Sequence, residues 1–387
     1  MVVSVLKPTS SPRTAWYWLR RLLIHAASTL ALLAAVEGIA FLMMRNEQVP
    51  PPERTVRRNV AERQHTRYDE LLGWVNVPNT VLSNMYGEGR HVHINNLGFR
   101  GTTPIDPEQP AAARRVILSG DSFTFGYGVG DGQTWGAGLA RREPGLEVLN
   151  MGLGGYGLGQ AYLWYRREGD PLPHDLHIFS FITENFRRMT RSRFMGYGKP
   201  VLTAREGQLV VENVPPPQPA AAAAGPAPRW LETAQNLNIV RLINAQLAQV
   251  RQQQSDRWQR NAEETAALIF TELFALHKKA GRTGVLVYLP VQRDHRTSDS
   301  DRWRSWLAGK AEENGWAFID LVRDLRRLPR EKIDGLFIGQ RSPYSGARGH
   351  YTEAGNEWVA ETLHQHLHQR PELAAHLDTL AQADSQR

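Results

Sequence analysis

The chain has 387 residues with 46 Lys plus Arg, 39 Asp plus Glu and 41% apolar residues, a composition typical of globular proteins and not of disordered chains. The lack of cysteine excludes disulfides, Cys-ligated metal sites and a thiol nucleophile. Residues 1–62 hold eight cations and four acids, so +4 of the net charge of +7 lies there and only +3 on the rest. Nucleic acid is therefore not an expected partner.

Residues 22–44 form the first predicted element, an apolar run of 23 residues that only His25 and Glu37 interrupt. As a helix that rises about 1.5 Å per residue, this run covers a hydrocarbon layer of about 30 Å. Met44 and Arg45 end it, whereas a cleavable signal peptide would have a small-residue cleavage site there. We therefore predict an uncleaved, single-pass membrane anchor.

Basic residues on the two sides of this anchor are balanced in number, but Arg20 and Arg21 directly abut it. Positive charge next to a span marks its cytoplasmic side, so we expect residues 1–21 in the cytoplasm. The anchor would then lie in the inner membrane, with the bulk of the chain in the periplasm or outside. Glu37 lies two thirds of the way along the run, where an ionisable group is costly. Either a tilted helix brings Glu37 near the outer interface, or Glu37 contacts another membrane protein.

Residues 45–63 are polar, contain a Pro-Pro-Pro run and are predicted to be a semi-rigid spacer. Residues 64–112 alternate short apolar and polar stretches between Gly, Asn and Pro residues. This second pattern predicts a small β-rich module.

Residues 113–369 alternate short apolar runs with longer helical stretches. Strands are predicted at 116–118, 147–149, 176–182, 284–289 and 317–321, and helices at 158–167, 301–314 and 353–367. Strands that alternate with helices imply an α/β fold with a parallel sheet covered on both faces. In such sheets the ligand site lies beyond the carboxyl ends of the strands, so we expect the loops there to carry the chemistry.

An insertion at residues 187–235 contains a predicted hairpin and a Pro/Ala-rich linker, and residues 370–387 are predicted to be a C-terminal tail. A lid, a docking element and mere decoration are all compatible with the insertion. Four arginines follow Asn185 and face either solvent or an anionic glycan, namely Arg187, Arg188, Arg191 and Arg193. Aromatic residues near the same loops either stack on a sugar or pack in the core, namely Phe123, Phe125, Tyr127, Tyr156, Phe186, Tyr344 and Tyr351.

Four loops of this region supply the parts that acyl transfer needs, which are a nucleophile, a base and donors for an oxyanion. Ser122 follows the first strand and would attack, and His350 precedes the last helix and would take its proton. The N–H groups of Ser122 and Gly155 and the side-chain amide of Asn185 would hold the developing negative oxygen. This chemistry needs neither a metal nor a cofactor, and we expect none.

In this order the four loops resemble the four blocks of the SGNH (GDSL-type) hydrolase family, which contribute Ser, Gly, Asn and His. The resemblance covers roughly residues 115–368, with an insertion, and rests on Gly120-Asp121-Ser122, Gly155, Asn185 and His350. It implies a flavodoxin-like three-layer α/β/α domain. It also implies serine esterase, lipase or carbohydrate O-acyl esterase activity.

One departure from the family pattern concerns the group that orients the base. The family generally places an aspartate two or three residues before its catalytic histidine, where this chain has Arg348 and Ala347. Three alternatives follow: a Ser122–His350 dyad oriented by a backbone carbonyl, a distant acid such as Asp334 in the orienting role, or turnover that is slow or absent.

From the sequence we expect a membrane-anchored serine ester hydrolase or O-acyltransferase that acts on O-acetyl groups of a cell-envelope or secreted polysaccharide. Two rival hypotheses remain. One is a non-catalytic protein of the same fold that binds a glycan or takes part in assembly, which the missing aspartate and Glu37 favour. The other is a lysophospholipid-type lipase, which the membrane tether favours.

Overall fold

The computed structural model describes residues 12–44, 65–107, 114–218 and 238–377, apart from Arg341 and Pro343. The predicted spacer at 45–63, most of the Pro/Ala-rich linker and the last ten residues lie outside these ranges. The chain divides into two compact units. One comprises residues 1–56 and 223–258, and the other comprises residues 57–222 and 259–387.

The first unit contains helix α1 (Pro12–Met44), which begins ten residues before the predicted anchor. Within α1, Trp16–Ile39 is long and apolar enough to cross a membrane, with a mean hydropathy of 1.8, as either an anchor or a signal sequence. Glu37 Oε2 accepts a hydrogen bond of 3.0 Å from the backbone N–H of Ile239, near the start of helix α7 (Asn238–Ala280). Glu37 thus has a partner within its own chain.

The second unit is built on a five-stranded parallel sheet in the order β13-β12-β7-β5-β6. Its strands are β5 (Arg114–Gly120), β6 (Leu146–Gly152), β7 (Leu176–Phe181), β12 (Thr283–Tyr288) and β13 (Ala317–Asp320). Numbered along the chain, this order reads 2-1-3-4-5 from the β6 edge, which is the flavodoxin-like, doubly wound arrangement. The structure therefore confirms the predicted α/β fold class.

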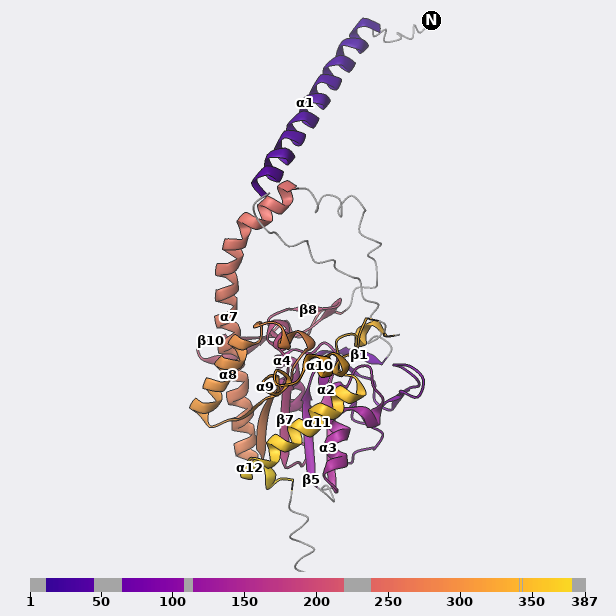
Figure 1. Ribbon diagram of the computed structural model, residues 1–387, viewed down its shortest axis with the longest axis vertical. Helices are drawn as coiled ribbons and strands as arrows, with labels where there is room; N and C mark the ends of the chain where they lie inside the picture. Colours follow the sequence, from indigo (N-terminus) through magenta and orange to yellow (C-terminus); the bar gives the residue numbers. More distant parts are fainter. Residues whose placement is uncertain are drawn as a thin grey trace, which may run out of the picture. The chain divides into compact units, whose positions relative to one another are not determined.

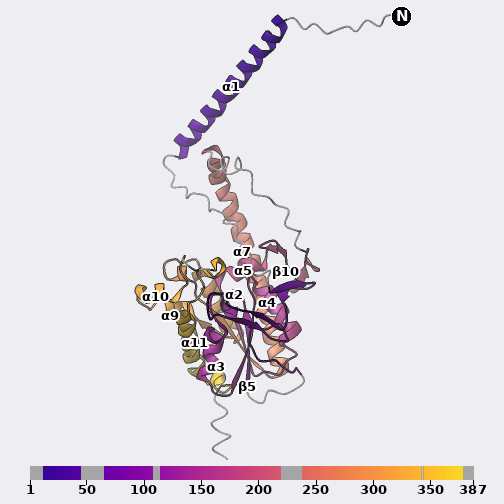
Figure 2. The same cartoon turned by 90° about the vertical axis from the view of Figure 1, so that its right-hand side faces the viewer.

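Helices cover both faces of this sheet (Figures 1 and 2). Strand residues such as Val116, Ile178 and Val287 pack on one face with Trp135 and Leu363 from two of the covering helices. That face carries α3 (Trp135–Arg142), α9 (Leu321–Leu325) and α11 (Glu353–His368), and the opposite face carries α4 (Leu158–Trp164) and the C-terminal part of α7. The remaining helices are α2 (Ser122–Phe125), α5 (Thr183–Met189), α8 (Asp301–Asn314), α10 (Arg330–Leu336) and α12 (Pro371–Ala374).

Helix α11 shows how the sequence sets one of these elements. The Thr352 hydroxyl caps its start by accepting from Gly355 N–H, and the helix then buries an apolar stripe that includes Val359, Leu363 and Leu367. The predicted C-terminal tail at 370–387 begins with a short helix that belongs to the folded unit, because Leu373 of α12 is fully buried against the same core.

The predicted β-rich segment forms two antiparallel hairpins within the same compact unit as the sheet. They pair β1 (Thr66–Asp69) with β2 (Gly73–Asn76) and β3 (Thr80–Leu82) with β4 (Val92–Ile94). The Arg100 N–H donates to Asn150 O at 3.0 Å, which joins this segment to edge strand β6. Within the insertion, two further hairpins pair β8 (Arg193–Phe194) with β9 (Tyr197–Gly198) and β10 (Val201–Arg205) with β11 (Gln208–Glu212).

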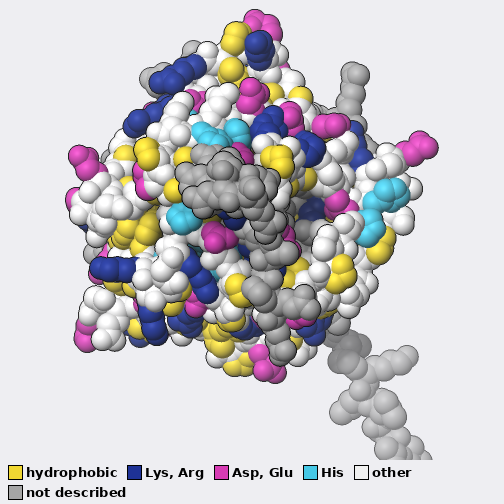
Figure 3. Space-filling model, turned by 90° about the horizontal axis from the view of Figure 1, so that it is seen from below, with side chains coloured by type: hydrophobic (Ala, Val, Ile, Leu, Met, Phe, Trp, Pro, Cys, Tyr) yellow, Lys and Arg dark blue, Asp and Glu magenta, His cyan; other side chains and the backbone are white. Residues whose placement is uncertain are grey.

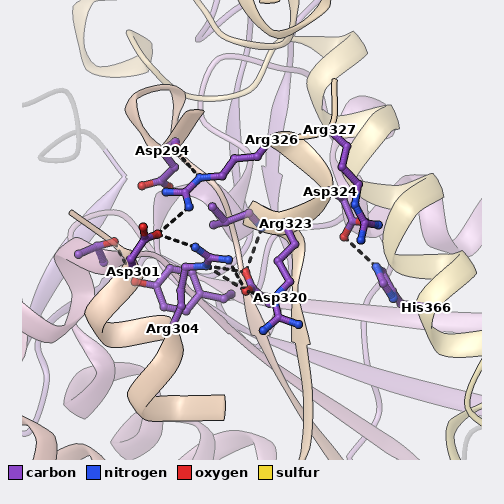
Figure 4. Close-up of polar contacts among 12 residues, drawn as sticks. Asp294, Asp301, Arg304, Asp320, Arg323, Asp324, Arg326, Arg327 and His366 are labelled. Atoms are coloured by element: carbon purple, nitrogen blue, oxygen red, sulfur yellow. Dashed lines mark hydrogen bonds and ion pairs between the residues drawn. The ribbon is translucent and has the colours of Figure 1, made fainter. Parts of the chain in front are cut away.

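An ion-pair network fastens α8 to the end of β13 (Figure 4). Arg304, from α8, binds both carboxylate oxygens of Asp320 at 2.6–2.9 Å, and both side chains are less than a tenth exposed. Asp320 also caps α9 through Val322 N–H. Arg326 extends the network to Asp301 at 2.7 Å. These contacts fix the β13 edge of the sheet, away from the switch point between β5 and β7.

Candidate active site

Ser122 lies at the carboxyl end of β5, as the first residue of the short helix α2. The Asp121 side chain caps this helix by accepting from Phe123 N–H at 2.9 Å. Gly120 is required before the turn, because a Cβ there would lie 2.1 Å from Thr124 Oγ1 and 2.8 Å from Ser180 O. This geometry holds Ser122 beyond the sheet at the point where the strand order reverses, which is the expected place for a ligand site.

His350 is placed directly against this serine. His350 Nε2 lies 2.7 Å from Ser122 Oγ, within hydrogen-bond distance. Reciprocal backbone bonds fix its loop, since Ile338 N–H donates to His350 O and Gly349 N–H donates to Ile338 O, both at 2.8 Å. The imidazole packs against the ring of Phe123, with centroids 4.5 Å apart, and against that of Tyr127 at 5.3 Å. The predicted nucleophile and base therefore meet from segments 228 residues apart.

The three groups predicted to bind an oxyanion differ in the hydrogen bonds that they already make. Neither the N–H of Ser122 nor that of Gly155 donates a hydrogen bond to any residue that the structure describes. Asn185 is already engaged, because its Nδ2 donates to Asp121 Oδ2 at 3.0 Å and to Tyr156 O at 2.8 Å. The Asn185 amide lies at the site, but it must give up one of these bonds before it can bind an oxyanion.

Arg188 is a site residue that sequence reasoning missed. It was expected to face solvent or an anionic glycan, but its Nη1 lies 3.0 Å from Asp121 Oδ2, and the two side chains are 13% and 1% exposed. The two residues are therefore a sheltered ion pair directly behind Ser122. Burial, together with the charges of Arg188 and Arg191, lowers the pKa of neighbouring Lys199 to about 7. The spacing of Arg188, one helical turn after Asn185, was the signal that could have revealed it.

A second arginine supports the nucleophile loop from the β-rich segment. Arg100 Nη1 donates to Phe125 O and Gly126 O at 2.6 and 2.7 Å, and its Nη2 donates to Val129 O at 2.7 Å. Its Nε pairs with Asp131 at 3.0 Å, and its side chain is only 2% exposed. Arg100 thus ties down the carbonyl groups of the segment that follows α2.

Asp334, the distant acid considered for orienting His350, does not contact it. Asp334 Oδ1 lies 3.5 Å from both Gln292 Nε2 and Arg296 Nη2, and its side chain is 50% exposed. The physical reason is its place on α10, which turns Ile333 and Leu336 toward the core and leaves Asp334 on the outer face. The contacts of Asp334 give the distant-acid hypothesis no support.

The aromatic residues near the loops are mainly core residues. Phe123, Phe125, Tyr127, Tyr156, Phe186 and Tyr351 are all buried, and of the seven that were considered only Tyr344 is partly exposed. Phe194, from the insertion, instead lies at the site, since a Cβ on Gly155 would lie 2.4 Å from its ring. The insertion therefore reaches Gly155, one of the predicted oxyanion donors; we call this place the oxyanion corner.

No family model and no curated protein sequence matches the chain. Solved structures give low-identity matches that each cover about two thirds of it. A member of the lipolytic protein G-D-S-L family from Veillonella parvula DSM 2008 is 13% identical over 65% of this chain and 97% of its own, with a TM-score of 0.35. A lipase/acylhydrolase from Enterococcus faecalis is 12% identical over 66% and 95%, with a TM-score of 0.34. The acetyl xylan esterase AlAXEase is 15% identical over 65% and 99%, with a TM-score of 0.38.

Proposed function

We propose that this chain is a membrane-anchored serine esterase or O-acyltransferase of the SGNH type. The observation that carries the proposal is the 2.7 Å contact between Ser122 Oγ and His350 Nε2. The N–H groups of Ser122 and Gly155, which donate no hydrogen bond to the residues that the structure describes, support it. A serine hydroxyl becomes a nucleophile when an adjacent base takes its proton, and preorganised N–H groups stabilise the oxyanion that forms.

The reaction proceeds in two halves. His350 Nε2 takes the Ser122 hydroxyl proton while Oγ attacks the ester carbonyl carbon, and the carbonyl oxygen becomes an oxyanion held by the N–H groups of Ser122 and Gly155. The tetrahedral intermediate then collapses, and His350 returns the proton to the leaving alcohol oxygen. This leaves an acyl group on Ser122. Water or a sugar hydroxyl next gives its proton to His350 and attacks the acyl carbon. The bond from that carbon to Ser122 Oγ then breaks, His350 returns the proton to Oγ, and a carboxylic acid or an acylated sugar leaves.

The proposed substrates are O-acetyl groups of a cell-envelope or secreted polysaccharide. Phe194 lies against Gly155 at the oxyanion corner, which favours a short acyl group over a long lipid chain on that side. The candidate span at Trp16–Ile39 supports an anchored enzyme. Its basic N-terminal flank supports placing the second unit in the periplasm or outside.

The direct test is hydrolysis of 4-nitrophenyl acetate by the full chain in detergent, compared with its Ser122→Ala and His350→Ala variants. We expect both substitutions to abolish hydrolysis, and the double variant to be little worse than either alone, because the two groups act as a unit. Full activity in Ser122→Ala would overturn the enzyme assignment.

A reporter fused after Arg387 tests the placement. An exported reporter supports the proposed orientation, and a cytoplasmic one contradicts both the orientation and the polysaccharide substrate.

A second candidate function is a non-catalytic glycan-binding or assembly protein of the same fold. Two observations favour it: Arg348 and Ala347 replace the family aspartate, and the Asn185 amide is already fully engaged. Undetectable hydrolysis of all short esters by the unaltered chain, combined with retained binding of an acetylated glycan, would select this candidate.

A further inference from the structure

Three potential metal ligands converge at the opposite end of α11 from His350. Glu143 forms the C-terminal cap of α3, and His364 and His368 stand on successive turns of α11. One carboxylate oxygen of Glu143, Oε1, lies 2.6 Å from His364 Nε2 and 2.5 Å from His368 Nε2. The two imidazole centroids are 4.4 Å apart. The three side chains therefore point to one place from two helices.

This cluster is sheltered but open to solvent. The side chains of Glu143, His364 and His368 are 12%, 26% and 31% exposed. It lies near the C-terminal end of α11. Histidine side chains reach the surface on the face of the molecule that Figure 3 shows. His368 is about 22 Å along α11 from Glu353, at about 1.5 Å per residue, so the cluster is separate from the candidate active site.

We propose that Glu143, His364 and His368 bind a divalent transition-metal ion of the zinc type, with water completing a tetrahedral shell. Imidazole nitrogen and carboxylate oxygen are zinc ligands, and two histidines four residues apart on a helix present their nitrogens on one face. The three ligand atoms lie within 4.8 Å of one another. Metal–ligand bonds of about 2.0–2.1 Å put tetrahedral ligands about 3.3 Å apart, so Glu143 Oε1 needs to withdraw by less than about 1 Å.

The surrounding charges favour a cation at this point. The C-terminal ends of α3 and α11 both lie here, and a helix C-terminus carries partial negative charge. The nearby cations Arg141 and Arg142 are both paired with Glu357, at 2.8 and 2.6 Å. The Glu143 carboxylate is thus directed to the two imidazoles, and a bound ion would take the place of the two Nε2–H hydrogens through which they donate to it.

A bound ion would join the two helices that follow the catalytic residues in the sequence. Helix α3 comes after the Ser122 loop, and α11 begins three residues after His350. At the N-terminal ends of α3 and α11, away from the cluster, Trp135 N–H already donates a hydrogen bond to Asn356 Oδ1 at 3.0 Å. The ion would therefore act as a structural clamp. This inference does not depend on the proposed esterase activity.

The experiment is a calorimetric titration of the full chain in detergent with ZnCl₂, after treatment with EDTA and purification without a histidine tag. We expect one site, and an affinity reduced at least 100-fold in His364→Ala and in His368→Ala. Glu143→Gln should weaken binding, because it keeps the side-chain shape and removes the charge. His366→Ala is the matched control, since His366 lies on the same helix but contacts Asp324 at 2.8 Å. It should bind zinc as the unaltered chain does.

Cobalt substitution supplies a second measurement. The Co²⁺ form should show the visible absorption of tetrahedral coordination, and that absorption should disappear in the His364→Ala/His368→Ala double variant. Circular dichroism tests whether the variants are folded. If they are not, the Co²⁺ spectrum of the unaltered chain is the measurement that tests the proposed site. Failure of the unaltered chain to bind micromolar Zn²⁺ would overturn the proposal. So would a folded double variant that binds as tightly as the unaltered chain.

Discussion

Two serine–histidine pairs lie three residues apart at the end of β5, and the structure gives them different surroundings. In one, Ser122 Oγ lies 2.7 Å from His350 Nε2, and in the other, Ser119 Oγ lies 2.8 Å from His177 Nε2. Hydrogen-bond geometry alone does not distinguish them. Ser119 and His177 are inside neighbouring strands and are at most 1% exposed, whereas Ser122 begins a helix beyond the sheet, beside backbone N–H donors.

The His177 imidazole is also engaged through its second nitrogen. His177 Nδ1 lies 3.0 Å from His277 Nε2, and the His177 ring stacks on Tyr165 with centroids 3.6 Å apart. Complete burial lowers the pKa of His177 well below its usual value, which disfavours the protonated imidazole that a general base must become. A hydrogen bond between a serine and a histidine therefore does not by itself indicate a nucleophile.

The largest expected effect comes from removing each serine in turn. Ser122→Ala should lower the rate of 4-nitrophenyl acetate hydrolysis by about 10⁴-fold or more. Ser119→Ala should change it less than tenfold, because Ser119 only bonds within the sheet. Steady-state kinetics of both variants measures the contrast. Equal losses in the two variants would show that the comparison is mistaken.

The proposed oxyanion donors provide the next test. Asn185→Ala should lower kcat by ~10²–10³-fold while KM stays nearly unchanged, if Asn185 exchanges its bond to Asp121 for one to the oxyanion. The measurement is kcat and KM on the same ester. An effect confined to KM would make Asn185 a substrate-binding residue and leave Ser122 N–H and Gly155 N–H as the oxyanion donors.

The ion pair behind Ser122 should matter for stability. Arg188→Met leaves the Asp121 carboxylate buried without its cation, and removing one partner of a buried pair costs about 3–5 kcal/mol of unfolding free energy. Urea unfolding of the full chain in detergent gives this value. Asp121→Asn in the same chain should recover part of the loss, and no recovery would mean that Arg188 acts through its packing on Phe194 instead.

The buried histidines around the second pair predict sensitivity to acid. Burial lowers the pKa of His174 to about 4 and that of His277 to about 3, so below pH 6.5 the unfolded chain binds protons that the folded chain does not. Stability should therefore fall as pH decreases from 6.5 toward 4, by about 2 kcal/mol for each histidine between pH 6.5 and 5. Urea unfolding at several pH values measures the slope. His277→Gln should reduce that slope. An unchanged slope would argue against attributing the acid sensitivity to the buried histidines.

Local patterns were enough to predict the sheet and the meeting of Ser122 with His350. Gly120, Asp121 and Ser122 form the turn that positions Ser122, and His350 directly precedes a helix with a side-chain cap. Residues adjacent in the sequence therefore determine the positions of both side chains. The role of Arg188 and the contacts of Asp334 depend on which helix face meets the core, and no short motif encodes that. Glu143 is 221 residues from His364, so only the folded chain brings them together.

The contacts of Arg100 limit where the chain can be truncated without loss of structure. It comes from the segment before the α/β region, yet it donates to three carbonyl groups of the loop that follows Ser122. A fragment cut at residue 113 would lose this support and leave those carbonyl groups without their donor. Expression boundaries, domain swaps and chimeras should therefore keep the chain from before Thr66 onward as one piece. The hairpins that look like an appendage belong to the same folded unit as the sheet and the candidate site.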